Sequence, residues 1–328
     1  MQIELEQPAS SARSRDSDPS ESAVREPAAS EPQGTVWPQR LMTLLILVAP
    51  FAALGIVITQ TLDGGFAWRN VILAVIFYVV IAHGVTVGFH RYFTHHGFVA
   101  SRPLKIALAV AGSMSLQGSM IGWVADHRRH HRFSDREGDP HSPVRPETQG
   151  FGRLRGMGHA HAGWFFEQAG TDRAKFAADL LADRDLVIID KLFVPLSVAT
   201  FVLPFGLGYA IGGTFAAGLA AFLWAGVLRV GLFHHLSWSI NSLCHVFGRQ
   251  PFRSNDASRN VAPLALLSMG ESWHNAHHAF PTLARHGVDR YQIDTSAAII
   301  RLFERLGWAT NVRWPTPDYL AKRRVLPV

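Results

Sequence analysis

The sequence predicts an all-α membrane protein with four transmembrane helices and a cytoplasmic helical cap, which carries a histidine-rich site for two metal ions. Two observations lead to this fold class. Four apolar stretches of about 20 residues each match the thickness of a bilayer. In addition, 17 of the 328 residues are histidine, and most of them gather in short clusters between and after these stretches. A single cysteine excludes internal disulfides, cysteine-ligated zinc fingers and iron–sulfur clusters.

The N-terminal segment differs in composition from the rest of the chain. Residues 1–36 consist mainly of Ser, Pro, Ala, Glu and Arg, with almost no large apolar side chains. Such a segment cannot bury enough surface to offset the entropy lost on ordering, so we expect a disordered tail. It also lacks the basic start and apolar run of a secretory signal peptide. The folded membrane domain is expected to occupy residues 37–328.

The apolar stretches predict membrane-spanning helices. A soluble core helix of this length would show a polar face, and these stretches show almost none. A further run, Leu104–Val124, is less apolar because it contains three serines and a glutamine, and it is predicted to be an amphipathic or interfacial helix. The predicted spans are residues 41–59, 68–89, 192–209 and 214–233.

Positive charge sets the expected orientation. Lys and Arg number 4 before the first span, 14 in residues 90–191 and 11 in residues 234–328, whereas the two connections on the opposite side hold only Arg69. Both termini and the two basic segments, which form the cap, are therefore expected on the cytoplasmic side. This charge suits an anionic membrane or head group, and no nucleic-acid-binding module is present. The Ala-, Gly- and Arg-rich composition suggests a bacterial source, which would place the protein in the plasma membrane.

The clustered histidines have spacings that a helix brings to one face. The groups are His90 with His95, His127 with His130 and His131, Asn241 with His245, and His274 with His277 and His278. Positions i, i+3 and i+4 share one face of an α-helix, so the members of the last three groups can converge. His90 and His95 are five apart, and they converge best if the helix ends or bends between them.

The number of clustered histidines indicates more than one metal ion. Nine imidazoles exceed the four ligands of a structural zinc site, and two ions with four or five nitrogen ligands each match the number. A single interfacial histidine is more often a surface or hydrogen-bonding group than a ligand. Chance would rarely place all these clusters on one side of a four-span protein, so we expect a shared metal site. Imidazole suits iron, zinc, copper and nickel, so the spacing alone does not choose the metal.

At these residues the sequence resembles the membrane fatty acid desaturases, specifically the stearoyl-CoA (delta-9) type. The similarity covers roughly residues 37–315. The matching stretches are GFHRYFTHH (88–96), WVADHRRHHRFSDREGDPHSP (123–143), HAGW (161–164), WSINSLCH (238–245) and GESWHNAHHAFP (270–281). The combination of these boxes is highly specific, whereas any one box alone is a weak signal.

The resemblance implies a non-haem di-iron centre and no catalytic residue beyond the metal ligands. The implied ligands are His90, His95, His127, His130, His131, His245, His274, His277 and His278, with Asn241 contacting one metal through water. Four further positions match the bend of a tunnel for the acyl group of the substrate: Gln117, Trp123, Ser237 and Trp238.

The other eight histidines are expected to support the site or to lie at the surface. His83 is predicted to hydrogen-bond inside the bundle, and His141 to support the second histidine box from outside the metal site. His96 follows His95 where many relatives have another residue. The remaining five are expected to be surface or supporting groups: His159, His161, His234, His235 and His286. Cys244 is predicted to be a buried small residue.

The expected activity is the O2-dependent introduction of a cis double bond, at delta-9, into a long-chain saturated fatty acyl-CoA for lipid biosynthesis. A methylene C–H bond in the middle of an acyl group has no accessible pKa, so acid–base catalysis cannot break it, and an oxidant made from dioxygen by a metal is needed. No fused cytochrome b5 domain is expected, because no stretch of the sequence resembles one. Electrons are therefore expected from a separate carrier of the ferredoxin, rubredoxin or cytochrome b5 type with its reductase.

Two other functions are weighed against desaturation. A membrane di-iron hydroxylase acting on lipids or alkanes would have similar boxes, but the GESW and WSINSLCH stretches favour the desaturase. A membrane metal transporter or sensor would place polar ligands at mid-membrane, whereas the predicted spans hold almost none beyond His83. An oxygenated product would identify the hydroxylase, and metal flux in vesicles would identify the transporter.

Overall fold

The structure is a computed structural model, and it describes most of the protein that follows the predicted tail. Residues 1–36 lie outside the described residues, so the prediction of disorder there stays a prediction. The described ranges are residues 37–144, 152–166 and 170–325. Within them, helices dominate, and the predicted all-α class with four candidate membrane spans is confirmed.

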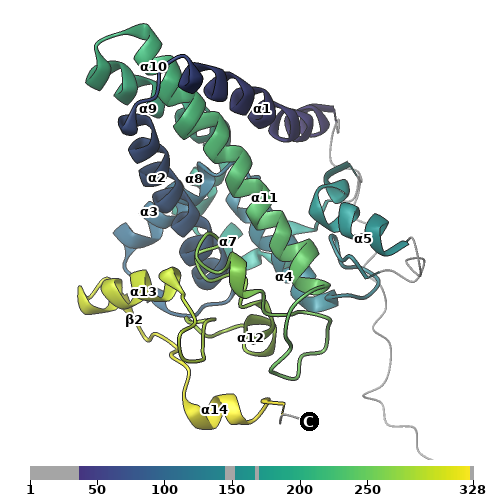
Figure 1. The fold of residues 1–328 in the computed structure, drawn as a ribbon. Coiled ribbons are helices and arrows are strands. Elements are labelled where there is room, and N and C mark those ends of the chain that lie inside the picture. Colours follow the sequence, from purple (N-terminus) through teal and green to yellow (C-terminus); the bar gives the residue numbers. More distant parts are fainter. Residues whose placement is uncertain (1–36, 145–151, 167–169, 326–328) are drawn as a thin grey trace, which may run out of the picture.

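The four candidate spans form an elongated bundle above a cap of short helices (Figure 1). Two of them are outer helices, α1 (Trp37–Leu62) and α9 (Phe193–Gly212), because only 17% of the most apolar window of each is buried. The other two are inner helices, with 56% and 50% of that window buried. The first inner helix is α2 (Trp68–His83) with its continuation η2 (Gly84–Thr94). The second runs through α10 (Phe215–Ala221), η4 (Phe222–Leu228), α11 (Arg229–Ser242) and η5 (Leu243–His245).

The inner helices are longer than the sequence predicts. The predicted ends were residues 89 and 233, whereas the helices continue to Thr94 and His245, over 27 and 31 residues. At 1.5 Å per residue these lengths are about 40 and 46 Å, well beyond a hydrocarbon core of about 30 Å. Hydropathy falls where polar side chains begin, but the backbone hydrogen bonds go on. The last turns therefore carry His90 and His245 into the cap.

The first inner helix changes type where it enters the cap. η2 is a π-helix, in which hydrogen bonds join residues i and i+5, and the His95 N–H donates to the His90 carbonyl oxygen at 3.2 Å. This wider turn places His90 and His95 on one face, so the expected end or bend is a change of helix type. Gly84 lets α3 (Arg102–Ser113) pack closely, since a Cβ at this position would lie 2.3 Å from the Gly112 nitrogen.

The run Leu104–Val124 is not one helix, so this prediction is wrong. It divides into α3 and α4 (Met120–Phe133), joined by a turn in which Leu116 has φ 63° and Gly118 has φ 100°. Serines at 113, 115 and 119 and the flexible Gly118 favour the turn over a continuous helix. The break changes the direction of the backbone, so that α4 carries the second histidine box into the cap.

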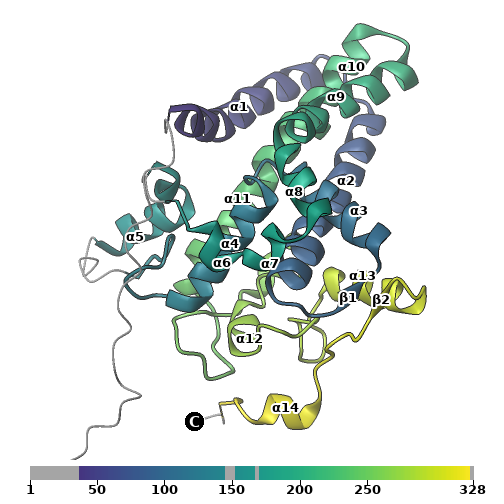
Figure 2. The same cartoon turned by 180° about the vertical axis from the view of Figure 1, so that it is seen from behind.

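Short elements complete the cap, seen from both sides in Figures 1 and 2. β1 (Val99–Ala100) pairs antiparallel with β2 (Ala309–Thr310). The remaining helices are α5 (Gly152–His161), η3 (Gly163–Phe166), α6 (Arg173–Phe176), α7 (Ala178–Leu181), α8 (Arg184–Lys191), η6 (Ala262–Leu264), α12 (His274–Ala279), α13 (Thr295–Arg305) and α14 (Pro317–Ala321).

The main apolar core lies at the junction of the spans and the cap. Phe89 of η2, Leu108 of α3 and Met120, Ile121 and Val124 of α4 are all buried in one cluster. This packing fixes η2 against α3 and α4, which are the elements that flank the first two histidine boxes. The core therefore positions the histidines more directly than it holds the outer spans together.

Candidate metal centre

The nine clustered histidines converge from four elements at the cap end of the inner spans. Their ring nitrogens form two groups, and within each group the ligand atoms all lie within 4.8 Å of one another. The first group is His90, His95, His127, His131 and His277, and the second is His130, His245, His274 and His278. Most of the nine are buried, and His131 is half-buried. The division into five and four could not be read from the spacing.

The nitrogen separations match those of ligands on shared ions. Two nitrogens bound about 2.1 Å from one ion and at right angles to each other lie about 3 Å apart. The Nε2–Nε2 contacts in the first group are 2.9 Å for His90–His277, 2.9 Å for His277–His131 and 3.1 Å for His131–His127. In the second group, His245 and His274 approach to 3.0 Å.

Some ring nitrogens in the two groups lack the hydrogen-bond partner that a buried polar atom needs. The Nε2 atoms of His95, His130 and His278 are buried and have no hydrogen-bond partner among the described residues. A buried polar atom without a partner costs free energy, and a metal ion would satisfy each of these nitrogens. The residues present therefore fit two metal ions, one in each group.

Four carboxylates fix the orientation of the rings from behind. A ligand histidine usually donates its other ring N–H to such a group, which leaves the second nitrogen free for the metal. The Nδ1 partners are Glu271 for His90, Asp139 for His130 at 2.9 Å, Asp135 for His245 at 2.9 Å, and Asp256 for His278 at 2.6 Å. Our sequence reasoning missed these roles, although Asp135, Asp139 and Glu271 lie inside the quoted boxes.

Burial sets the protonation states of the site. It lowers the pKa of His127 well below the ordinary value, and neighbouring imidazoles lower it further; His277 is affected in the same way. These rings are therefore neutral, as metal coordination requires. Burial alone would raise the pKa of Asp256, but its hydrogen bond with His278 brings that pKa far below its usual range. The carboxylate is thus held ionised as an acceptor.

A buried cation balances the carboxylates beneath the first group. Arg91 is only 1% exposed, and its guanidinium bonds Glu271 at 2.9 Å and Asp294 at 2.9 Å. Asp294 also accepts the backbone N–H of His286 at 2.8 Å and of Ala297 at 2.9 Å. Arg91 therefore ties η2 to the segment that precedes His274 and to the start of α13.

The histidines outside the two groups occupy varied places. His96 has φ 51° and an exposed side chain directed at Arg128 and Asp179, so it lies away from both groups. His83 is buried and contacts the Val79 carbonyl at 2.7 Å, as expected for a group inside the bundle. His286 is only 1% exposed, and its ring centroid lies 4.4 Å from that of His277, so it is not a surface group.

Other predicted supporting groups lie behind the second group or beside α11. His141 is buried, with its ring centroid 4.4 Å from that of His130. His161 contacts His235 at 3.1 Å between their ring nitrogens. Cys244 is fully buried, as predicted.

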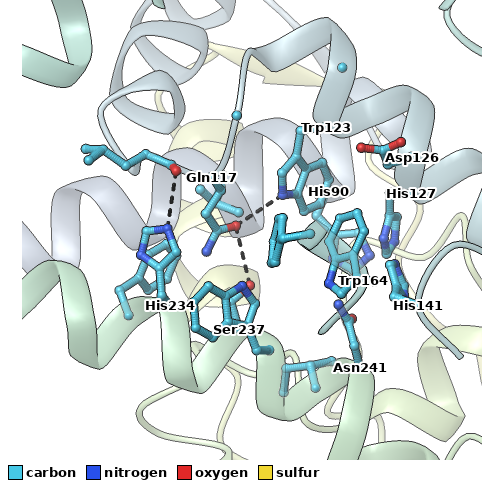
Figure 3. Close-up of a pocket in the computed structure, with 18 of the residues that line it drawn as sticks. His90, Gln117, Trp123, Asp126, His127, His141, Trp164, His234, Ser237 and Asn241 are labelled. Atoms are coloured by element: carbon cyan, nitrogen blue, oxygen red, sulfur yellow. Dashed lines mark hydrogen bonds between the residues drawn. The ribbon is translucent and has the colours of Figure 1, made fainter. Parts of the chain in front are cut away.

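A cavity of about 510 Å³ adjoins both histidine groups. His90, His127 and His274 form part of its wall, and Asn241 faces it from α11 (Figure 3). The predicted substrate residues all line this cavity: Gln117, Trp123, Ser237 and Trp238. Much of the remaining wall is apolar: Ile46, Val85, Phe165, Phe193, Phe233 and Leu236.

Two hydrogen bonds to Gln117 form a polar contact in the cavity wall (Figure 3). The Gln117 side-chain oxygen accepts the Trp123 indole N–H at 3.1 Å and the Ser237 hydroxyl at 3.4 Å. His234, which sequence reasoning left as a surface or supporting group, is buried in the wall and contacts the Leu116 carbonyl at 3.2 Å. It thus holds the turn that presents Gln117.

The arrangement of two histidine groups beside an apolar cavity has a counterpart among known proteins. Residues 66–305 match the model of the family described as fatty acid desaturase. The chain belongs to the fatty acid desaturase family. This membership agrees with the resemblance seen in the histidine boxes, and it extends over most of the described spans and cap.

Curated desaturase-family relatives match most of the sequence. It is 39% identical over 245 residues to hex-5-enoyl-[acyl-carrier protein] acetylenase of Moorena producens, covering 74% of this chain and 76% of the relative. It is 36% identical to delta-9 acyl-lipid desaturase 1 of Arabidopsis thaliana (83% and 80% covered) and 34% identical to acyl-CoA C20 delta5-desaturase of Anemone leveillei (78% and 78%).

Removing one orienting carboxylate is expected to weaken metal binding by the second group. Asp256→Asn keeps the size of the residue but removes the charge that accepts the His278 N–H, so metal affinity should fall about 10- to 100-fold. Metal content after dialysis against a graded chelator series measures this shift. Asp289→Asn, which alters a carboxylate paired with Arg324, is the control. Equal metal retention in Asp256→Asn and the wild type would contradict the orienting role.

Proposed function

We propose that the protein is a membrane di-iron desaturase that introduces a cis double bond, at delta-9, into long-chain saturated fatty acyl-CoA. The observation that carries this proposal is the shared wall, in which histidines of both groups line one largely apolar cavity. An acyl group in that cavity would lie directly beside both metal positions. Family membership supports the reaction class, and the cavity supports an apolar substrate.

The nature of the reaction favours iron in the two histidine groups. Imidazole donors suit several metals, but zinc has no redox chemistry, and breaking an unactivated C–H bond needs an oxidant. A bound iron pair supplies that oxidising power from dioxygen and two electrons. The proposed ligands are the nine histidines, with Asn241 contacting one iron through water.

The protein's own residues bind, orient and exclude water. The apolar wall takes up the acyl group and keeps water from the reacting methylenes. Gln117, anchored by Trp123 and Ser237, gives the wall one fixed point against which the substrate lies. Holding one C–C bond beside the metals would convert a chance encounter into a positioned reaction and restrict the product to a single double-bond position.

The charge distribution supports an orientation with the cap and both termini in the cytoplasm. In a bacterium this corresponds to the plasma membrane. In that compartment the electron donor would be a separate ferredoxin, rubredoxin or cytochrome b5 type carrier with its reductase. The basic cap, with 11 Lys and Arg in residues 234–328, suits an acidic carrier.

The names of the relatives define the alternatives for the substrate head group. They describe enzymes that act on acyl-carrier protein, acyl-lipid and acyl-CoA substrates. Purified protein with an electron donor and O2 should therefore be given stearoyl and palmitoyl groups as CoA thioesters, carrier-protein thioesters and phospholipids. We expect cis-delta-9 products from the CoA thioesters. CoA thioesters left unchanged would overturn the substrate assignment, and an oxygenated product would favour the hydroxylase.

Loss of the polar contact at Gln117 is expected to blur the position of the double bond. Gln117→Leu leaves the Trp123 and Ser237 donors without their acceptor, so the wall loses its fixed point. We expect kcat/KM to fall about 10- to 100-fold and positional isomers to appear, with metal content unchanged. Mass spectrometry of derivatised products measures the isomers. Gln250→Leu, at an exposed site, is the control; a single unshifted isomer from Gln117→Leu would contradict this role.

A further inference from the structure

One segment assigned to the cap combines exposed apolar side chains with a lack of charged residues. Residues 261–269, VAPLALLSM, contain no charged side chain, and the sequence is uncharged from Asn260 to Gly270. Leu266 is 57% exposed and Leu267 is 46% exposed, and Ala262 and Pro263 are exposed as well. Four exposed apolar residues with no charged side chain among them are unfavourable on a cap surrounded by water, so the surroundings of this segment need an explanation.

A hydrogen bond fixes the level of this segment along a membrane span. The hydroxyl of Tyr78, in α2, donates to the Leu267 carbonyl oxygen at 2.6 Å. Tyr78 lies ten residues after Trp68, the first residue of the span, and ten residues rise about 15 Å along a helix. Even a tyrosine side chain that points wholly toward the cap would reach only ~6 Å further along the helix axis, which equals the rise of about four residues. Leu267 therefore lies within the first ~25 Å of a hydrocarbon core about 30 Å thick.

Aromatic residues mark the membrane edge from which this depth is counted. Trp68 is 70% exposed, Phe215 is 68% exposed and Tyr209 is 51% exposed, and all three lie at the α1–α2 and α9–α10 connections. Exposed aromatic side chains concentrate at the membrane–water interface. The level of Trp68 is thus the interface opposite the cap.

The backbone of the segment makes several of the internal hydrogen bonds that a hydrocarbon environment favours. In a bilayer core, peptide groups must find partners within the protein. The segment forms the 3-10 turn η6, and then the N–H of Ser268 bonds the Leu264 carbonyl at 2.9 Å and that of Gly270 bonds the Ala265 carbonyl at 2.8 Å. The Leu267 carbonyl, which projects from this turn, is satisfied by Tyr78.

We propose that residues 262–267 form a re-entrant segment that inserts into the bilayer beside α2, with its exposed apolar side chains in contact with the hydrocarbon tails of lipids. The cap is then anchored in the membrane by this segment as well as by the spans. Ser268 and Glu271, which follow directly, line the cavity. The membrane-inserted segment therefore continues into the wall of the candidate metal site.

The single native cysteine makes the proposal testable by site-directed spin labelling. Cys244 is fully buried, so an introduced cysteine reports its own surroundings. The test variants are Leu266→Cys and Ala262→Cys. The control is Ala321→Cys, an exposed site on α14 at the end of the molecule opposite the α9–α10 turn (Figure 1). The full-length protein is labelled in detergent and reconstituted in lipid nanodiscs, where reagents reach both faces.

Collision with two relaxing agents separates lipid from water at each label. We expect labels at positions 262 and 266 to collide with O2, which dissolves in lipid, and to be shielded at least about 10-fold from a water-soluble nickel chelate relative to the control label. Nickel collisions as frequent as those of Ala321→Cys would place the segment in water and overturn the proposal. A label that neither agent reaches, and whose spectrum is broadened by spin–spin coupling, would show that a second copy of the protein covers the segment. This result would also overturn the proposal.

Discussion

Replacing His277 by alanine is expected to abolish turnover while the protein still inserts into membranes. The Nε2 atom of His277 contacts those of both His90 and His131 at 2.9 Å, so this ring stands at the centre of the first group. Its loss should lower activity at least about 1,000-fold, which corresponds to about 4 kcal/mol in the barrier. His130→Ala should act equally on the second group. Activity and bound metal are measured on the same purified sample.

The matched control for these variants is His96→Ala. His96 is next to His95 in sequence but has an exposed side chain outside both groups, so its variant should keep the wild-type activity and metal content. Full activity in His277→Ala or His130→Ala would refute the site assignment. Loss of activity with unchanged metal content in either variant would contradict a role for that ring as a ligand.

Removing the buried cation beneath the first group is expected to give the largest loss of stability. Arg91→Met leaves Glu271 and Asp294 as buried carboxylates without their common partner. Breaking a buried ion pair by removing one partner costs about 3–5 kcal/mol in the free energy of unfolding. A marked fall in the thermal unfolding midpoint in detergent, followed by tryptophan fluorescence, would show this loss.

An exposed ion pair provides the comparison for Arg91. The Arg102 side chain is 74% exposed and bonds Asp185 at 2.8 Å, so solvent screens the pair. Arg102→Met should leave the unfolding midpoint near that of the wild type. An Arg91→Met protein that unfolds at the wild-type temperature would show that the buried network does not stabilise the fold.

The spans could be predicted from sequence because bilayer thickness imposes a length and an apolar composition on each helix. The ends of the inner helices toward the cap could not be predicted, since hydropathy reflects the solvent preference of side chains and not the hydrogen bonds of the backbone. The second inner helix continues from residue 233 to His245, where Ser237 and Asn241 line the cavity and His245 joins the second group. The turn that separates α3 from α4 was missed because the prediction rested on the overall apolar composition of the run, which does not report the positive φ angles of Leu116 and Gly118.

The nine clustered histidines could be predicted because i, i+3 and i+4 spacing is a local property of a helix. The division into two groups depends on how four elements meet, and it crosses the boxes: His127 and His131 join the first group, whereas His130, between them, joins the second. The orienting carboxylates were missed since an aspartate in a loop, such as Asp256, carries no periodic signal. Whether the nine rings are all metal ligands stays a prediction.

The metal content of the purified full-length protein tests the central claim most directly. Two groups of five and four imidazoles predict two iron ions per molecule. Elemental analysis together with Mössbauer spectroscopy of protein grown on enriched iron should show two high-spin irons with nitrogen-rich ligation. Stoichiometric zinc, or a single ion per molecule that persists in His277→Ala and His130→Ala alike, would contradict the di-iron centre.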